Sequence, residues 1–544
     1  MNQLALIALA VLATTLRVFV LIVLSIVSGW LLGYLAFKNA RFESFYVSFI
    51  EVLESVPVIS FFPIALIFFV NRIGGVLGVE LAADFLVFTA VVWNIWIGIY
   101  QAYKTIPKEM LEVVENYGLG FFGRLSGLFI PFSIPRIVSN LFPSVADGFF
   151  YITVSEVFAV GSTSYSVFGI GSLLQNYLSE NEWKLVYASM LAMALVIVAT
   201  VFALREFSAL AVAKYALDTD VPIMRRGRVR IRYSVLFSQL VSRNPLHKLS
   251  IYQWRSVIRR AQQTSFVQTK AKNRFQKVVR YGVFSALISL VLLIAYGVIE
   301  VLVTIPLDQW HSLIVSTPSL LVDLAFDYAR VSVIALVSLV IAVTLGYYLA
   351  VNKSAEAIGI PLIQVLSAYP APLYFPFVFA LSFEIVRSSL GPLSVEFYVV
   401  LLGFVSTFYY VFYSFWMGVK SLPHEYWEIM KNLRLGFFQR IRKIVLPASF
   451  PYLISGISST INSAWGGLML AEYWPNIVDG KTLTVKHGLM KVVDLSTYTG
   501  NVSQAAWGSF IFGIVVVVYS LLFTKRMMDI ARKRYVAEEG IYAA

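Results

Sequence analysis

Apolar segments long enough to cross a lipid bilayer recur along the whole sequence. A transmembrane helix needs about 17 to 25 predominantly apolar residues. Hydrophobic residues make up 59% of the 544 and charged residues only 13%, which excludes an ordinary soluble domain. The sequence therefore predicts an all-α, polytopic membrane protein with about eleven transmembrane helices. The predicted spans are 12–36, 54–70, 84–104, 136–158, 186–206, 281–304, 328–351, 363–383, 397–419, 452–474 and 507–524.

A basic stretch, 207–279, separates the fifth and sixth spans. It is rich in Lys and Arg, and its acidic residues are Asp218 and Asp220. Because positive residues are retained on the inner side of the membrane, we expect this linker and the basic C-terminal tail to be cytoplasmic. Nucleic-acid binding by the linker is the alternative, but membrane topology alone accounts for the net charge of +13. We therefore expect a lipid bilayer, and no nucleic acid, as the partner of this charge.

The sequence contains an internal duplication. Residues 105–137 align without gaps with residues 421–453, and twelve of the thirty-three positions are identical. Matched charges and prolines continue outside this block, so the duplication covers about 12–205 and 328–525. Chance similarity between apolar segments would not match charges and prolines together. Two parallel copies imply a pseudo-twofold axis along the membrane normal, with a path for a solute between them.

The parity of the spans predicts the topology. Five spans in the first copy leave its end on the side opposite to its start, so the span 281–304 supplies the crossing that lets the second copy face the same way. With the linker inside, the N-terminus lies outside, and the loops 105–131 and 421–447 lie in the cytoplasm. The predicted domains are a first repeat (1–206), the linker (207–279), an extra helix with an external loop (280–327) and a second repeat with a basic tail (328–544).

The two matched cytoplasmic loops are too polar to span the membrane and too patterned to be plain connectors. We expect each to form two short helices. Pro107 suits the first turn of a helix, and the i,i+3 spacing of Glu109 and Glu112 puts both carboxylates on one face. Gly120 permits a sharp turn, and two phenylalanines follow it. For a single loop, an amphipathic connector at the membrane surface is the competing interpretation; two matched loops favour a docking element.

The first loop resembles the EAA loop of ABC importer permeases. Its pattern, E-x5-G-x9-L-x-I-P, begins at Glu112 and places a glycine at Gly118. The second loop departs from the family at Arg434, where the family has glycine, and both loops lack the two alanines. We expect Gly120 and Gly436 to make the turn. The candidate coupling residues are Glu109, Glu112, Gly118, Gly120, Phe121, Phe122 and Pro131 in the first copy and Glu425, Glu428, Gly436, Phe437, Phe438, Leu446 and Pro447 in the second.

The resemblance implies a mechanism and partners. In such permeases each loop docks in a groove of an ATPase subunit, whose ATP-driven closure moves the membrane halves between inward-open and outward-open states. It implies two MetI-like five-helix repeats, two ABC ATPase subunits and an extracytoplasmic solute-binding protein in the plasma or inner membrane. This chain would bind no cofactor, because ATP and Mg²⁺ belong to the partner ATPase. The closing segments of both copies resemble permeases for nitrate, sulfonate and similar anions.

Charged residues inside the spans are few, costly and usually functional. Two pairs match between the copies, and we hypothesise that Arg17 pairs with Glu156 and Arg330 with Glu472, to gate the outer end of the path or to fix helix packing. The second span of each copy carries matched prolines that kink or break the helix and are candidates to line the path. They are Pro57, Pro63, Pro370 and Pro376.

The sequence offers no chemistry for an enzyme. It has no cysteine, and its four histidines are scattered, so no metal site is predicted. The segment GLGFFG, from Gly118, resembles a dinucleotide fingerprint, but no strand precedes it. A polytopic enzyme is thus weakly supported. A secondary transporter with parallel repeats is the main alternative, although such a protein should carry coupling groups near the midplane of broken helices.

Overall fold

The computed structural model describes residues 3–55, 58–61, 65–160, 163–215, 306–478 and 480–519, with a few isolated positions elsewhere. The predicted linker from residue 216 onward lies outside these ranges, as do Pro57, Pro63 and, apart from isolated positions, the predicted span 281–304.

The first repeat begins with the longest helix of its half, and three shorter helical elements take the place of its predicted second span. The elements are α1 (Gln3–Lys38), α2 (Ala40–Ser55), a 3₁₀ turn η1 (Val58–Phe61), a π-helix η2 (Leu66–Ile73), α4 (Gly75–Lys104), α5 (Lys108–Asn116), α6 (Phe121–Arg124), η3 (Leu125–Phe129), α7 (Ile130–Ser155), β1 (Val157–Val160), β2 (Thr163–Ser166), α8 (Ile170–Ser179) and α9 (Trp183–Tyr215).

The second repeat follows the same order, as the duplication predicts. Its elements are α14 (Leu307–Ile341), η4 (Ala342–Gly346), α15 (Tyr347–Val351), α16 (Lys353–Ala368), α17 (Ala371–Leu390), η5 (Gly391–Leu393), α18 (Ser394–Lys420), α19 (His424–Asn432), α20 (Phe437–Arg440), η6 (Ile441–Val445), α21 (Leu446–Glu472), β3 (Tyr473–Val478), β4 (Lys481–Thr484), α22 (Leu489–Tyr498) and α23 (Val502–Tyr519).

The fold class is confirmed as an all-α polytopic membrane protein. In the described part of the chain, eight helices are long and apolar enough to cross a membrane; the predicted count of eleven is not reproduced there. One of the eight, Ala371–Lys420, takes in most of two predicted spans, because the short η5 turn joins α17 to α18. The predicted span 54–70 is instead divided among α2, η1 and η2.

Proline explains the break in the second span of the second repeat. Helix α16 stops before Tyr369, whose ψ of 119° is extended, and Pro370 is the N-cap of α17. A residue that precedes proline is driven out of the helical region by the proline ring, so two helices form where one span was predicted. Pro376 lies inside α17.

Two short antiparallel hairpins, β1–β2 and β3–β4, were not predicted. Each begins where a long span ends, after Ser155 in α7 and after Glu472 in α21. Their apolar first strands continue the hydrophobic run of the preceding helix, and a short apolar run does not distinguish a strand from the end of a helix.

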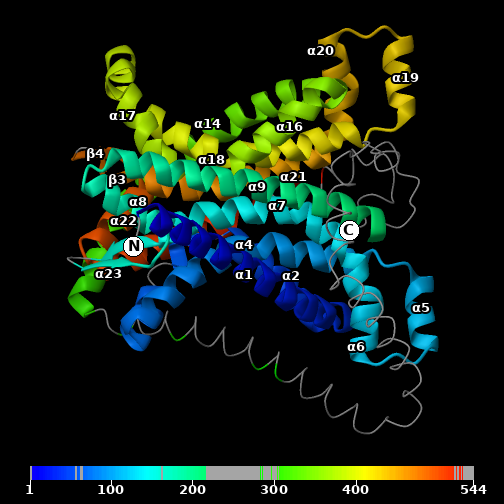
Figure 1. Cartoon of the computed structure of the whole chain (residues 1–544), viewed down its shortest axis with the longest axis horizontal. Coiled ribbons are helices and arrows are strands. Elements are labelled where there is room, and N and C mark those ends of the chain that lie inside the picture. Colours follow the sequence, from blue (N-terminus) through cyan, green and yellow to red (C-terminus); the bar gives the residue numbers. More distant parts are fainter. Residues whose placement is uncertain are drawn as a thin grey trace.

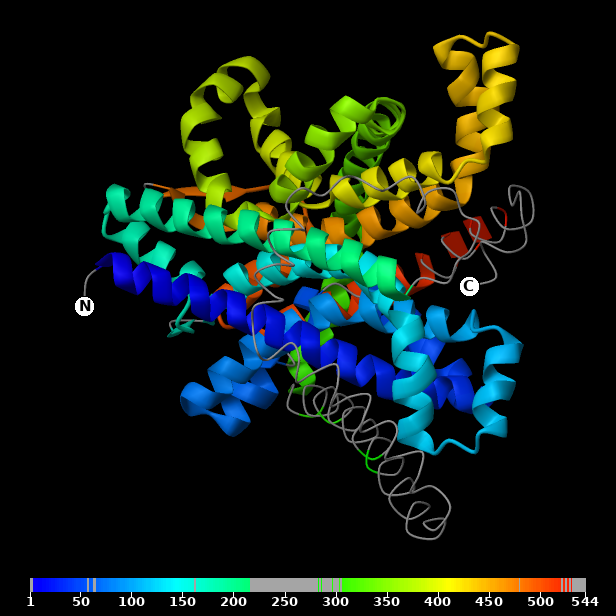
Figure 2. The same ribbon diagram turned by 45° about the vertical axis from the view of Figure 1, so that its right-hand side comes forward.

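In each repeat, the elements that replace the predicted second span pack against helices of the other repeat. Helix α16 contacts α7 and α9, and α17 contacts α7; in return, η1 contacts α21 and α23, and α2 contacts α23. Both pairs of short helices, α5–α6 and α19–α20, lie at the same end of the molecule (Figures 1 and 2). The hairpin β3–β4 and the helices α8 and α22 lie at the opposite end (Figure 1).

Candidate functional site

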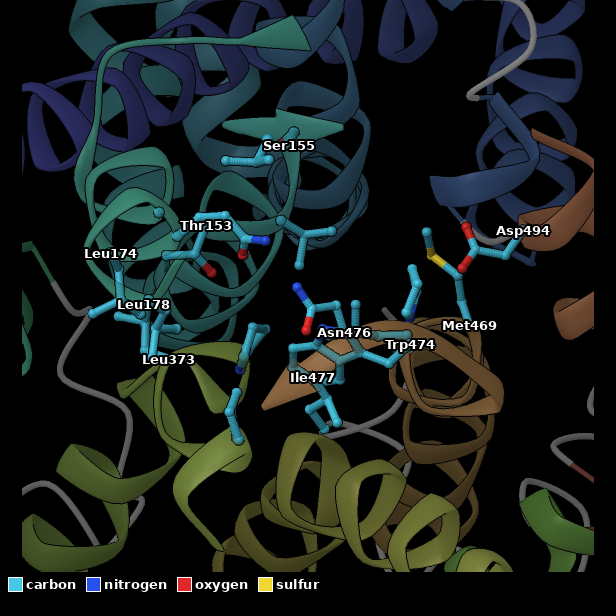
Figure 3. Close-up of a pocket in the computed structure, with 18 of the residues that line it drawn as sticks. Thr153, Ser155, Leu174, Leu178, Leu373, Met469, Trp474, Asn476, Ile477 and Asp494 are labelled. Carbon is cyan, nitrogen blue, oxygen red and sulfur yellow. The ribbon is translucent and has the colours of Figure 1, made fainter. Parts of the chain in front are cut away.

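A cavity of about 670 Å³ lies between the two repeats, at the end opposite the short helix pairs. Its walls come from the ends of α7 and α21, from the helices α8 and α22, and from α17 and strand β3 (Figure 3). The volume is in the range of small-molecule sites. Pro376 lines it, and Pro370 is not among the described lining residues. Both repeats therefore contribute to the wall of one partly open cavity.

The floor of this cavity is closed by contacts between the repeats. A Cβ atom on Gly466 of α21 would lie 2.2 Å from the Tyr151 hydroxyl of α7, so only glycine permits this approach. Below it a second cavity of about 50 Å³ shares Tyr151 with the first. There Asp147 of α7 accepts hydrogen bonds from Tyr410 and, at 3.2 Å, from Tyr409 of α18. These hydrogen bonds connect α7 of the first repeat to α18 of the second.

Arg330 is the centre of a buried charge cluster in the second repeat. Its Nη1 atom lies 2.9 Å from Glu472 Oε1 and 3.0 Å from Asp327 Oδ1, and its Nε atom lies 2.7 Å from Glu396 Oε2. The side chain of Arg330 is 5% exposed, and those of Glu472 and Asp327 are fully buried. The hypothesised partner Glu472 is thus within ion-pair distance, together with two carboxylates that were not predicted.

Arg17 makes a looser version of this cluster in the first repeat. Its Nη2 atom lies 2.8 Å from Glu80 Oε2, and its Nη1 atom lies 3.6 Å from Glu156 Oε1. Thr14 stands where the second repeat has Asp327. The sequence did hold a signal for the missed partners, because GVLGVE at 75–80 matches GPLSVE at 391–396 and ends in the glutamate.

These clusters hold the cavity walls. Glu156 accepts a hydrogen bond from the Gly171 N–H at 2.6 Å, in the first turn of α8. In the second repeat, Asp327 accepts the Leu489 N–H at 2.8 Å and Glu472 the Lys491 N–H at 3.1 Å, in the first turn of α22. Carboxylates at a helix N-terminus satisfy orphan N–H groups and the helix dipole. These hydrogen bonds thereby connect the charge pairs to the helices that line the cavity. A role of the charge pairs in gating stays a prediction.

The two elbows, residues 108–124 and 424–440, each combine an exposed acidic helix with a phenylalanine pair. Glu109, Glu112, Glu425 and Glu428 are exposed. In each pair the first phenylalanine is anchored: the ring of Phe121 lies 5.1 Å from Tyr34, and that of Phe437 lies 5.6 Å from Tyr347. The second packs edge-on against the first and is the more exposed of the two, with Phe122 55% and Phe438 82% exposed. Pro131 and Pro447 lie in the first turns of α7 and α21.

The prediction that the elbows turn at Gly120 and Gly436 is wrong. The left-handed residues are Gly118, with φ of 60°, and Arg434, with φ of 48°. Gly120 and Gly436 are extended N-caps of the next helices. A helix commonly ends on one left-handed residue that satisfies its last carbonyls, so the turn occurs directly after α5 and α19.

A matched arginine locks each elbow turn. Arg124 Nε donates to the Leu119 carbonyl at 2.7 Å, and Arg440 Nε donates to the Leu435 carbonyl at 2.6 Å. These arginines were identical positions in the duplication, but no role was predicted for them. A rigid elbow transmits a rigid-body motion, whereas a loose loop would dissipate it.

The fold and its site define a polytopic membrane protein in which two repeats share one cavity. The chain belongs to the family of binding-protein-dependent transport system inner membrane components, which matches residues 22–213 and 342–536. Each match falls on one repeat.

The similarity to individual relatives covers shorter stretches than the match to the family does. The chain is 23% identical over 136 residues to the bicarbonate transport system permease protein CmpB of Synechococcus elongatus, covering 25% of this chain and 45% of that protein. It is 25% identical over 150 residues to the nitrate import permease protein NrtB of Leptolyngbya laminosa, covering 28% and 50%. It is 26% identical over 129 residues to the putative aliphatic sulfonates transport permease protein SsuC of Bacillus subtilis, covering 24% and 43%. These similarities span about half the length of each relative.

Proposed function

We propose that this chain is the membrane permease of an ATP-driven importer for a small anionic solute. The observation that carries the proposal is the separation of two elements. Two matched elbows with exposed carboxylates and phenylalanines lie at one end, and a chamber shared by both repeats lies at the other. The anionic solute is inferred from the relatives, which are named as bicarbonate, nitrate and sulfonate permeases.

In this proposal each elbow docks in one ATPase subunit on the cytoplasmic side, and the chamber faces an extracytoplasmic binding protein. Closure of the ATPase pair moves the elbows, and with them α7 and α21, as rigid levers. The solute would enter the chamber above Tyr151 and Gly466, and leave when the bonds of Asp147 to the partner repeat open. The chain itself then binds no nucleotide, and its energy comes from the docked subunits.

The proposal predicts that uptake depends on ATP and on three kinds of protein. We expect proteoliposomes that contain this chain, two copies of its ATPase and the binding protein to take up nitrate, bicarbonate or methanesulfonate only with internal ATP and Mg²⁺. Omission of the ATPase should reduce uptake to the level of empty vesicles. Uptake by the chain alone, driven by an ion gradient, would instead identify a secondary transporter with parallel repeats.

A further inference from the structure

Asp494 is a carboxylate in the cavity wall that no other feature of the structure explains. It is the sixth residue of α22, and Gln175 is the sixth residue of the equivalent helix α8. Both line the chamber between the repeats. Figure 3 shows the carboxylate of Asp494 directed toward the interior beside Met469. The two repeats therefore present an amide and an acid at equivalent positions of one chamber.

No described residue neutralises this carboxylate. Among the described residues that line the cavity, none is lysine, arginine or histidine, and Asp494 is the one carboxylate. Within the same part of the chain, Asp494 forms no ion pair or hydrogen bond. Burial raises the pKa of Asp494 from 3.8 to about 7. Asp494 lies on α22, which is not one of the candidate membrane-spanning helices.

Tyr473 on β3 is a titratable neighbour of Asp494: burial, and then the nearby Tyr498 and Asp494, raise the pKa of its hydroxyl. The cationic groups near α22 are engaged elsewhere. On α22 itself, Lys491 Nζ donates to the Lys486 carbonyl at 3.2 Å, and the Tyr498 ring lies 6.0 Å from that of Tyr473 on β3. Strand β1 has no ionisable residue, and α23 has Tyr519 as its single one. The remaining charges next to α22 belong to the Arg330 cluster and its surroundings, namely Asp323, Asp327 and Arg330 on α14 and Glu472 on α21.

We propose that the chamber binds its anion through neutral hydrogen-bond donors and only while Asp494 is protonated, so that one proton is taken up with each anion. This inference rests on the proposed function, and it names the residue that selects the charge of the solute. The bound species would be an oxyanion, whose several oxygen atoms accept hydrogen bonds.

The physical reason is the effect of a like charge in a partly desolvated space, because Asp494 is half-buried in the cavity wall. An ionised carboxylate would repel an anion in the same chamber, because no cation screens the pair. A protonated carboxyl group instead offers an O–H donor. Further donors come from the side-chain amides of Gln175 and Asn476, whereas the Thr497 hydroxyl already donates to the Val493 carbonyl at 2.8 Å. Asn476 Oδ1 already accepts the Gly480 N–H at 2.9 Å, which leaves its NH₂ group to donate to a solute.

Saturation-transfer NMR of methanesulfonate with the full-length chain in lipid nanodiscs tests this inference. The probe stays ionised throughout, so its own charge does not change with pH. We expect the affinity to be highest below about pH 7 and to fall about tenfold for each pH unit above it, because only the protonated form binds.

Two matched variants isolate the carboxylate. Asp494→Asn should make methanesulfonate binding independent of pH. Gln175→Glu adds a second acid at the equivalent position, and should weaken binding at neutral pH by at least about tenfold, as expected for a second like charge.

Three results would overturn the inference. One is an unchanged pH dependence in Asp494→Asn, and another is the absence of any methanesulfonate signal from the wild-type chain. The third is binding of methylammonium that strengthens above about pH 7 and is lost in Asp494→Asn, which would make the chamber a cation site. None of these results bears on ATPase docking, which is scored separately by the ATP dependence of uptake.

Discussion

Reversing the charge of both elbows, with Glu112→Lys and Glu428→Lys together, is expected to remove the ATPase subunits from the purified complex. Both carboxylates are exposed on the outer faces of α5 and α19, so the change should leave the fold intact. Loss of a desolvated charged contact costs about 2 to 5 kcal/mol, which weakens docking at least about 30-fold at each elbow. The measurement is the number of ATPase subunits that co-purify, together with the rate of ATP hydrolysis.

The control makes the same charge change far from the elbows. Glu384 lies on α17, at the opposite end of the molecule, and its side chain is 74% exposed. Glu384→Lys should retain both ATPase subunits. Each single elbow variant should lose one of them. A double variant that keeps two subunits and coupled hydrolysis would show that the elbows are not the docking elements.

Arg330→Met is expected to destabilise the chain by about 3 to 5 kcal/mol, the cost of breaking a buried ion pair from one side. The substitution leaves the buried carboxylates of Asp327 and Glu472 without their cation. Arg17→Met should cost less, because Arg17 and its partner Glu80 are 18% and 31% exposed and therefore partly solvated. Thermal unfolding of the purified chain in detergent, followed by tryptophan fluorescence, measures the difference.

A second substitution tests whether charge is the cause. Asp327→Thr copies the residue that the first repeat has at the equivalent position, Thr14. In the Arg330→Met background it removes one uncompensated carboxylate, and it should recover part of the lost stability. If the double variant is no more stable than Arg330→Met alone, the destabilisation comes from lost packing of the arginine side chain rather than from the charges.

The duplication made the longest-range features of the fold predictable. Matched positions pointed to Glu156 for Arg17 and Glu472 for Arg330, and each pair lies within ion-pair distance although 139 and 142 residues separate them. The reason is that a duplicated contact places the same two residue types in both copies, here with the arginines 313 and the glutamates 316 residues apart. The common direction of the two elbows followed from the same repeat and the parity of the spans.

Features that differ between the repeats could not be predicted in this way. Asp327 has Thr14 as its counterpart, Asp494 has Gln175, and Asp147 has Ser463, so a comparison of the copies does not mark these acids. Asp147 also depends on Tyr409 and Tyr410, 262 and 263 residues away in the other repeat. Helix α22 is a short helix of ten residues, which the hydropathy of spans does not detect. The two repeats therefore differ in the acidic residues that they place at equivalent positions.

The turn of each elbow was mispredicted for a local reason. In the second copy Arg434 stands where the family has glycine. The glycines present in both copies, Gly120 and Gly436, were therefore predicted to make the turn. A single left-handed residue other than glycine costs only about 1 to 2 kcal/mol. The lock between Arg440 and the Leu435 carbonyl lies directly after the strained position and helps to hold it. The position after the helix, rather than the residue type, therefore determines where the elbow turns.

Site-specific cross-linking from the elbows tests the central claim most directly. The chain has no cysteine, so Phe122→Cys and Phe438→Cys each introduce a single thiol at an exposed aromatic position. With a reagent that carries a maleimide at one end and a photoreactive benzophenone, which inserts into C–H bonds, at the other, we predict that each variant cross-links to one ATPase subunit, and that the double variant cross-links to two. The account is contradicted if neither thiol reaches the ATPase, or if a membrane-impermeant maleimide labels the two positions from opposite sides of the bilayer.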